Sequence, residues 1–394
     1  MVEWKAKRVE ECASFYNGTA HENIVSDTGN FILITSKSIA TELADYRLVS
    51  EQLFPLYVDD IVMVMSDIPN GRALAKCLLI DKNNKYTLNQ RICCFREHKT
   101  DTRFLFYQLN RNKCFLAFND GYNQTNLRKI DILKCEILIP PLHEQHRIAK
   151  ALSDTDDFIA ALEKLIAKKR AIKQGAMQEL LTGKRRLSGF NGEWIDTVLG
   201  QISDILKGKG LSKSKVSVNG RYFCVLYGEL FTEYTEIIHS IVSKTEYEEG
   251  ILSKKGDILI PGSTTTTGID LARASTIPFD EVLIGGDVNI IRPRNNDVDS
   301  IFLSFYITNT KKQEIAIRAK GITVYHLHGK DLMDLPLRIP NDKAEQTAIA
   351  SIISDMDAEL DALTTKLNKL RNIKQGMMSE LLTGRIRLEE QETR

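Results

Sequence analysis

The 394-residue sequence contains no apolar run of 18 or more residues, so nothing in it predicts a transmembrane helix. Its opening residues, "MVEWKAKRVEEC", carry charges but no apolar stretch, and we expect no signal peptide. The seven cysteines are odd in number and none belongs to a C-x-x-C pair. Such usage is typical of buried thiols in a reducing cytoplasm rather than of disulfides or structural zinc, and it predicts a cytoplasmic protein.

The sequence also lacks an excess of positive or negative charge, because it contains 53 basic and 52 acidic residues. A globally basic nucleic-acid-binding body is therefore excluded, and any DNA contact must come from local clusters. There is no G-x-x-x-x-G-K-[ST] loop and no asparagine–proline–proline–aromatic tetrad of an adenine methyltransferase. The histidine pairs His143/His146 and His326/His328 lack the further ligands of a metal site. We expect no catalytic residue, metal or cofactor in this chain.

The sequence does contain a long internal repeat. Residues 144–183 and 345–384 are identical at 21 of 40 aligned positions, and both copies end in nearly the same phrase, "IKQGAMQELLTG" and "IKQGMMSELLTG". The second copy places apolar residues at alternating spacings of four and three, a heptad seam: Ile349, Ile353, Met356, Leu360, Leu363, Leu367 and Leu370. The first copy keeps this register from Ile148 to Lys169 with two polar exceptions. Each copy predicts one helix of about 38 residues, and pairing of the two copies would bury the narrow seam.

The rest of the chain forms two segments that resemble each other more faintly. Each has a tryptophan near its start, a strand-like run, a helix-like aromatic run and a closing phrase: "DDIVMV" (59–64), "FLFYQL" (104–109) and Gly121…Leu127…Asp131 in one, "GDILIP" (256–261), "FLSFYI" (302–307) and Gly321…Leu327…Asp331 in the other. We predict α+β domains at 1–139 and 185–338 that alternate with helical spacers at 140–184 and 339–394.

The repeated phrases "IPPLHEQHRIAKAL" and "IKQGAMQELLTGKRRL", with their second copies, resemble the conserved regions of specificity subunits of type I restriction–modification systems. The closing phrase resembles the end of that family's target-recognition domains. The resemblance implies an α+β fold with two similar target-recognition domains, separated by two long antiparallel coiled-coil helices in a pseudo-two-fold repeat. It also implies a non-catalytic subunit that recognises a bipartite, asymmetric site in double-stranded DNA. The implied partners are two modification subunits (adenine methyltransferases) and restriction or translocase subunits, which would hold S-adenosylmethionine, ATP and Mg²⁺.

Local clusters supply candidate DNA contacts. The "LKGKGLSKSK" segment (206–215) offers lysines to phosphates, and "GSTTTTG" (262–268) offers hydroxyls to phosphates or base edges. The closing phrases offer amides and other polar groups to bases, and Arg72 and Arg273 are candidate guanine readers. The candidates are Lys207, Lys209, Lys213, Lys215, Ser263, Thr264, Thr265, Thr266, Arg72, Tyr122, Asn123, Gln124, Asn126, Lys320, Thr323, Tyr325 and His326. For each of them an exposed loop, a self-capping turn or a surface ion pair remains an alternative.

The helix ends predict two equivalent docking sites for partner subunits. Leu180, Leu181, Leu381 and Leu382 lie beyond the seam. Gly175 and Gly376 each remove a side chain inside a helix at a cost of about 1 kcal/mol, which suggests a kink or the close approach of another helix. The basic runs "GKRRL" (183–187) and "GRIRL" (384–388) indicate phosphate or partner contacts, or cations placed near a helix C-terminus.

Two other functions are possible from the residues alone. A self-contained methyltransferase or nuclease would need a catalytic domain of about 150–200 residues, for which two domains and two helices leave no length. A coiled-coil scaffold without nucleic acid would explain the helices but not the amide-rich and lysine-rich domains.

Overall fold

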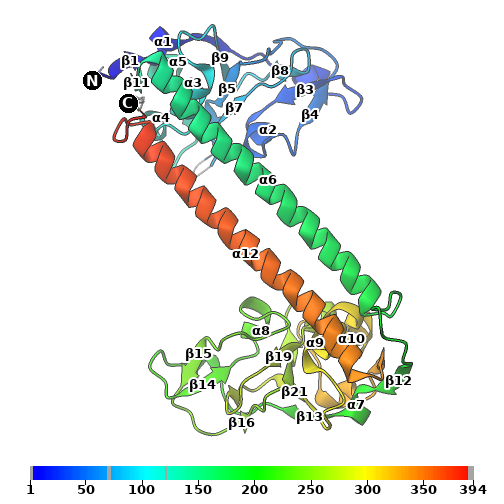
Figure 1. Cartoon of the computed structure of the whole chain (residues 1–394). Coiled ribbons are helices and arrows are strands. Elements are labelled where there is room, and N and C mark those ends of the chain that lie inside the picture. The colour runs from blue at the N-terminus through cyan, green and yellow to red at the C-terminus, as the bar shows by residue number, and fades with distance from the viewer. Residues whose placement is uncertain (1–2, 69–71, 120–121, 389–394) are drawn as a thin grey trace, which may run out of the picture. The chain divides into compact units, whose positions relative to one another are not determined.

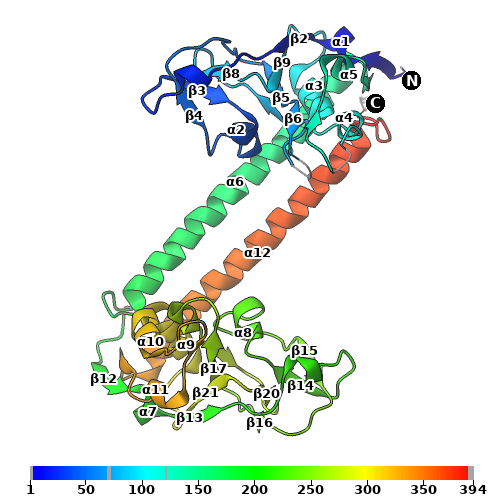
Figure 2. The ribbon, with the colours of Figure 1, turned by 180° about the vertical axis from the view of Figure 1, so that it is seen from behind.

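The computed structural model describes residues 3–68, 72–119 and 122–388 of the chain. The contacts within it divide the chain into two compact units. Unit 1 comprises residues 1–163 and 365–394, and unit 2 comprises residues 164–364. Each unit therefore combines one α+β domain with part of both long helices, as the ribbon views show (Figures 1 and 2).

Unit 1 is built on two sheets. An antiparallel sheet has the strand order β2-β9-β5-β7, and a second sheet has the order β4-β3-β8, with β3 and β8 parallel. The strands are β2 (Ser14–Asn17), β3 (Phe31–Ile34), β4 (Arg47–Val49), β5 (Ile61–Val64), β7 (Cys77–Leu79), β8 (Tyr86–Leu88) and β9 (Ile92–Arg96). The short helices are α1 (Val9–Cys12), η1 (Glu22–Ile24), α2 (Ser36–Ala40), α3 (Thr102–Leu109), α4 (Lys113–Leu116) and α5 (Lys129–Leu133).

Unit 2 repeats this plan. Its antiparallel sheet has the order β13-β21-β17-β19, and its second sheet has the order β15-β14-β20-β16 around the parallel pair β14 and β20. The strands are β13 (Ser203–Lys207), β14 (Tyr222–Val225), β15 (Ser243–Thr245), β16 (Ile251–Leu252), β17 (Asp257–Pro261), β19 (Ser275–Ile277), β20 (Leu283–Ile284) and β21 (Val288–Pro293). The short helices are α7 (Leu199–Ile202), η2 (Lys213–Lys215), α8 (Glu229–Thr232), η3 (Gly268–Leu271), α9 (Ser300–Thr310), α10 (Lys312–Arg318) and α11 (Gly329–Leu332).

The predicted strands and aromatic helices are confirmed. "DDIVMV" contains β5 and "GDILIP" contains β17, while the two aromatic runs lie in α3 and α9. In β5, Ile61 and Met63 pack into the core beneath α3, whereas Val62 and Val64 pack into the core shared with the second sheet. Because successive side chains of a strand point to opposite faces, a strand buried on both faces reads as a continuous apolar run.

Each unit also has two short strand pairs. In unit 1, β1 (Lys5–Arg8) pairs with β11 (Glu136–Ile139), and β6 (Ser66–Asp67) pairs with β10 (Thr125–Asn126). In unit 2, β12 (Trp194–Val198) pairs with β23 (Pro336–Pro340), and β18 (Ser263–Thr264) pairs with β22 (Tyr325–His326). The first kind of pair joins the start of a domain to its end, just before a long helix.

The two predicted long helices are α6 (Leu142–Leu180) and α12 (Lys343–Leu381). Every residue of the predicted seam is buried or half-buried, so the heptad pattern identified the inward stripe correctly. In unit 1 the end of α12 runs antiparallel to the start of α6, where Lys374 pairs with Asp156 and Arg371 pairs with Glu163 at 2.6 Å. In unit 2 Lys169 pairs with Glu359 at 2.7 Å, in the same antiparallel sense. No helix in the described part of the chain combines the length and apolar content needed to cross a bilayer.

The helix ends complete the domain cores. In unit 1, Leu381 is buried among core residues that include Ile148 and Leu152, and in unit 2, Leu180 and Leu181 are buried with Ile349 and Ile353. The first copy of the repeated phrase thus closes the core of the second domain, and the second copy closes the core of the first. This shared task explains why the phrase occurs twice.

A buried ion pair fixes each helix end just beyond these leucines. In unit 1, Arg387 binds Glu144 through two bonds of 2.8 Å, and in unit 2, Arg186 binds Glu345 at 2.5 and 2.7 Å. The side chains of Glu144 and Glu345 are each only 1% exposed. Burial alone would raise the pKa of Glu144, but hydrogen bonds from Arg387 and Trp4 outweigh it and lower that pKa. We call these pairs the clasps of unit 1 and unit 2.

A left-handed glycine lets the chain turn from each helix into its clasp. Gly183 and Gly384 both have φ of +69°, and a Cβ on either would lie 3.2 Å from the ring of Trp194 or Trp4, respectively. Glycine suits both the backbone conformation and the close approach of the tryptophan.

Candidate nucleic-acid interface

In unit 2 the strand pair β18–β22 brings two predicted DNA-contact segments together. Ser263 lies opposite His326, and Thr264 lies opposite Tyr325, so the "GSTTTTG" loop runs beside the closing phrase. The amide of Leu327 donates to the carbonyl of Gly262 at 2.8 Å and extends the pairing. These segments are about 60 residues apart in sequence, and their order along the chain gives no sign that they pair.

The lysine-rich loop joins the same surface through Asp287. The Asp287 carboxylate accepts a hydrogen bond from Ser263 and lies 3.7 Å from the ammonium of Lys207. Unit 2 therefore carries a composite surface made of residues 207–215, 262–268 and 320–326, which we call surface 2.

Part of the threonine-rich loop shapes the surface instead of facing outward. Ser263 and Thr264 are 7% and 8% exposed, and their hydroxyls bond Asp287 and Thr266. The prediction that these two hydroxyls contact DNA is wrong, because both are turned inward and occupied. Thr265 and Thr266 are exposed, so their predicted role remains open. Bonds donated by the Thr266 and Thr267 hydroxyls lower the pKa of Asp270, which keeps this carboxylate charged as the anchor of the loop.

The four lysines of the loop are all exposed, but their surroundings differ. Lys207 is partly neutralised by Asp287, and the ammonium of Lys215 lies 3.4 Å from the ring centroid of Tyr247. Cation–π contact leaves the charge of Lys215 in place while holding its position. Lys209 and Lys213 also remain predicted phosphate contacts.

The closing phrase of unit 2 forms the other side of surface 2. Lys320, Thr323 and His326 are exposed, while Tyr325 is half-buried against the core. The Lys320 ammonium is 3.2 Å from Asp331, and the ring of His326 stacks on that of His328 at 6.2 Å between centroids. These predicted base contacts are therefore held by neighbours within their own domain.

Unit 1 builds an equivalent surface from different residues. In the pair β6–β10, Thr125 lies opposite Asp67 and Asn126 opposite Ser66, and Leu127 donates to the carbonyl of Met65 at 2.8 Å. The Gln124 side chain donates to the Ser66 hydroxyl at 2.8 Å. We call residues 66–68 and 72 with 122–126 surface 1.

Two further features complete surface 1. The Asp67 carboxylate accepts hydrogen bonds from the amides of Ala73 and Leu74 at 2.7 and 3.1 Å, which holds the residues after the exposed Arg72 beside β6. Tyr122, Asn123, Gln124 and Asn126 are all exposed. Gly121 and the Pro69–Gly71 part of "PNGRAL" lie outside the described residues. The other candidate guanine reader, Arg273, packs over the ring of Phe231 in unit 2.

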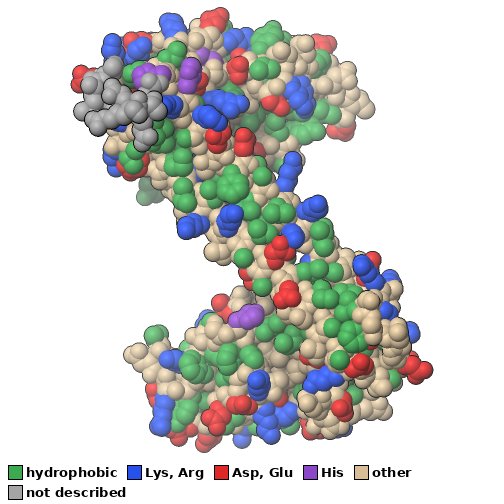
Figure 3. Space-filling view, viewed as in Figure 1, with side chains coloured by type: hydrophobic (Ala, Val, Ile, Leu, Met, Phe, Trp, Pro, Cys, Tyr) green, Lys and Arg blue, Asp and Glu red, His purple; other side chains and the backbone are tan. Residues whose placement is uncertain are grey.

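The space-filling view shows lysines and arginines interspersed with aspartates and glutamates on the visible face (Figure 3). In the described ranges no group of three or more histidine, cysteine, aspartate or glutamate side chains is placed to hold a metal ion. All seven cysteines are free, and all but Cys114 are buried, as predicted for structural thiols.

The family model for the type I restriction modification DNA specificity domain matches residues 1–174 and 191–372. The chain belongs to this family. The two matches coincide with the two repeats of the sequence and of the structure. Within this family the role of the chain is sequence recognition, and catalysis is not its task.

Curated relatives of the specificity family agree. The putative type I restriction enzyme MjaX specificity subunit of Methanocaldococcus jannaschii is 24% identical over 88% of this chain and 81% of its own length. The MjaVIII specificity subunit of the same organism is 26% identical over 73% of this chain and 71% of its own length. Among solved structures, the type I S subunit from M. genitalium matches 97% of this chain and 96% of its own with a TM-score of 0.64 at 17% identity, which supports the shared fold.

The predicted docking residues need correction. Leu180, Leu181 and Leu381 are buried inside the cores of their own units, and Leu382 packs half-buried against the same core as Leu381. They cannot serve as open docking sites, because the chain itself already covers them. The suggested close approach at Gly175 and Gly376 is also absent within the described chain: a Cβ on either would meet nothing within 4 Å. Their predicted role in binding a separate partner remains open.

Sequence reasoning missed the clasps. The partners Arg186 and Glu345 are 159 residues apart, and Arg387 and Glu144 are 243 apart. The available signal was that "EQ" opens each copy of the repeat and a basic run follows each copy. Where two copies pack antiparallel, the acidic start of one copy lies beside the basic end of the other. The basic runs therefore bind the chain itself through Arg186 and Arg387.

Proposed function

We propose that the chain recognises a bipartite, asymmetric site in double-stranded DNA, with surface 1 reading one half-site and surface 2 the other. The observation that carries this proposal is the matched register of β6–β10 and β18–β22 in two units whose exposed side chains differ. Identical scaffolds place their side chains alike, and different side chains select different bases. Two unequal surfaces therefore suit two unequal half-sites.

The chemistry of the surfaces supports complementary roles. Surface 1 offers Gln124, Asn126 and Arg72, whose side chains can form paired hydrogen bonds to adenine or guanine edges. Surface 2 offers the loop lysines to phosphates, with Thr323 and His326 beside them. In this proposal unit 2 supplies more of the electrostatic attraction to DNA.

The proposed partners are two modification subunits that methylate adenine, joined by restriction or translocase subunits in the cytoplasm. S-adenosylmethionine, ATP and Mg²⁺ belong to these partners. A solved chain from a study of complex assembly and conformational transition of a type I restriction–modification system matches 96% of this chain with a TM-score of 0.58 at 15% identity, which supports a shared fold with a chain that works in such a complex.

For the modification subunits we propose two equivalent docking faces on the long helices. Ile172 in unit 2 and Ile373 in unit 1 are each 47% exposed, one turn before the open Gly175 and Gly376. An exposed isoleucine beside a glycine gives a partner helix an apolar anchor and room for close approach. Because the repeat places this face once in each unit, two copies of one subunit can bind in the same way.

The recognition function is tested with the purified chain, its cognate modification subunit, S-adenosylmethionine and genomic DNA, followed by sequencing for N6-methyladenine. We expect methylation at one split motif, present only in the complete mixture. Methylation by this chain alone would contradict the assignment of catalysis to the partner. A complete mixture that binds DNA with no sequence preference would contradict the recognition role.

The docking faces are tested by Ile172→Asp and Ile373→Asp, with native mass spectrometry of the complex. Each single variant should lose one modification subunit and the double variant should lose both, while each unit keeps its unfolding behaviour. Leu252→Asp is a matched control, because Leu252 is a similarly exposed apolar residue that lies on the edge strand β16, outside the long helices. Retention of both subunits by the double variant would overturn this placement.

A further inference from the structure

The tip of the closing phrase in unit 2 carries an apolar side chain that the domain does not use. Lys320 and His326 exchange two backbone hydrogen bonds of 2.9 and 2.8 Å, which closes a tight loop of residues 321–325. Gly321 has φ of +145°, and a Cβ there would lie 1.8 Å from the carbonyl oxygen of Val324, so the turn requires glycine. This turn places Ile322 at the outside of the loop, where it is 94% exposed.

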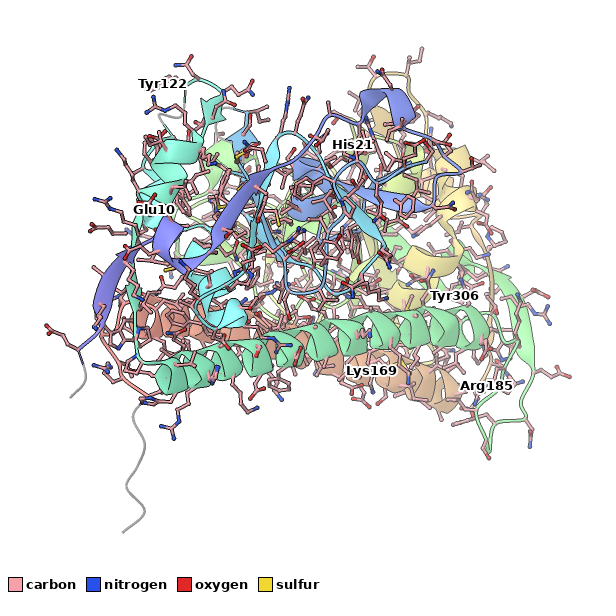
Figure 4. All side chains as sticks on the ribbon, turned by 90° about the horizontal axis from the view of Figure 1, so that it is seen from above. Glu10, His21, Tyr122, Lys169, Arg185 and Tyr306 are labelled. Carbon is pink, nitrogen blue, oxygen red and sulfur yellow. The ribbon has the colours of Figure 1, made fainter. Side chains whose placement is uncertain are left out.

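Unit 1 also exposes a large side chain at the equivalent position. Counted from the paired strands β10 and β22, Tyr122 occupies the place of Ile322, and it is 87% exposed. In the view from above, Tyr122 lies at the side of unit 1 opposite the start of α6 (Figure 4). A single exposed apolar side chain is ordinary, but polar residues are favoured at a tight turn. Two domains with different side chains that both keep a large apolar group at this tip indicate a shared use.

The surroundings of Ile322 fit nucleic acid better than a protein surface. Its neighbours on the loop are exposed and polar or cationic, namely Lys320, Thr323 and His326, and the exposed Thr265 follows β18 across the strand pair. A stable protein interface needs a wide patch, with an apolar centre. An exposed apolar tip whose own loop carries phosphate and base-edge donors instead matches side chains that touch thymine methyl groups or base faces within a DNA groove.

We infer that Ile322 in unit 2, and Tyr122 in unit 1, enter a DNA groove and contact bases directly, each setting the base preference at its own half-site. This inference rests on the proposed function and deepens it. Ile322 supplies apolar contact alone, whereas Tyr122 can stack and also offer a hydroxyl, so the two tips favour different bases. Lys320 and the strand pair β18–β22 hold the tip in position.

The experiment uses the assembled complex of full-length chain and modification subunits. The variants are Ile322→Ala, the conservative Ile322→Leu and the control Leu252→Ala, in which Leu252 is an exposed apolar residue on the edge strand β16. Methylated motifs are read by sequencing, and affinity is measured on duplexes that carry single base-pair changes. Ile322→Ala should weaken specific binding about 10-fold and relax the preference at the base pair or pairs that it touches in one half-site. Ile322→Leu should retain most of both, and Leu252→Ala should change neither.

The matched variant Tyr122→Ala should relax only the other half-site. An unchanged motif and affinity in Ile322→Ala, in a complex whose wild type methylates a split motif, would overturn this inference and leave the proposed function intact. Loss of modification subunits from Ile322→Ala with unchanged DNA affinity in the complexes that still form would also overturn it, in favour of a protein contact. A wild-type complex that methylates no split motif would overturn the proposed function, and this inference with it.

Discussion

Unit 1 and unit 2 differ most where they face outward and least where the helices close them. Both bury a leucine from the repeated phrase, both fix the following arginine on a buried glutamate, and both turn at a glycine with φ of +69°. Their candidate DNA surfaces share the strand register but not the side chains. The comparison teaches that the repeat maintains the scaffold, while recognition changes in the loops that the scaffold holds.

The largest effect is expected where a helix end enters a core. Leu180→Asp in unit 2 and Leu381→Asp in unit 1 place a charge at positions that are 5% exposed, and each should unfold its own unit. The milder Leu180→Ala and Leu381→Ala should cost about 2–5 kcal/mol each, and about equally. Hydrogen exchange followed by mass spectrometry reports on each unit separately. Normal protection with loss of partner binding would restore the docking role for these leucines.

The clasps should come next, and they should differ. Removing an arginine leaves a buried carboxylate unpaired, at a cost of about 3–5 kcal/mol. In unit 1 the indole of Trp4 still donates to Glu144 at 3.1 Å, whereas the indole nitrogen of Trp194 has no partner within the described residues. Arg186→Ala should therefore destabilise unit 2 more than Arg387→Ala destabilises unit 1, as measured by urea unfolding of each variant. Equal losses would show that the tryptophan bond contributes little.

Acid should weaken the clasp of unit 1. The pKa of Glu144 is lowered in the folded chain from its ordinary value of 4.5, so the unfolded chain binds the proton more readily. The stabilisation is then complete above about pH 4.5 and is lost as the pH falls through the folded-state pKa. Protection of unit 1 against hydrogen exchange should fall across this range in the wild type and fall less in Glu144→Gln. An equal acid response in both proteins would remove Glu144 as its cause.

The smallest effects are expected from single lysines of surface 2. Lys209→Ala should weaken binding to all sequences about equally and should reduce the slope of log affinity against log salt by up to about 0.9. Lys207→Ala should do less, because Asp287 already offsets part of that charge. The matching loop of unit 1, residues 17–24, contains no lysine or arginine, so its polar-to-alanine changes should leave the salt slope unaltered. A change of motif in Lys209→Ala would show that this lysine reads bases.

The sequence predicted what depends on local pattern. The heptad spacing identified the inward face of α6 and α12, and the apolar runs identified β5 and β17, because periodicity follows directly from helix and strand geometry. It failed where a role depends on distant partners. Leu180 and Leu381 were predicted to be exposed to a partner subunit because they lie beyond the heptad seam. In the structure each is covered by the α+β domain of its own unit. Ser263 and Thr264 were predicted to face outward because they are polar. The sequence does not show that the chain turns their hydroxyls toward Asp287 and Thr266.

The same reason explains why the sequence does not predict the exposure of Ile322. An isoleucine in a β-rich segment normally predicts a core position, and only the tight turn after Gly321 places it outside. Each clasp joins residues more than 150 positions apart, so it becomes visible only in the folded structure.

The most direct test of independent half-site reading is methylome sequencing of complexes altered in one surface at a time. Gln124→Ala with Asn126→Ala changes surface 1, and Thr323→Ala with His326→Ala changes surface 2. We predict that each pair alters the preferred bases in one half of the split motif and leaves the other half, and the gap between them, unchanged. Alteration of both halves by either pair, or of neither half by both pairs, would contradict the account.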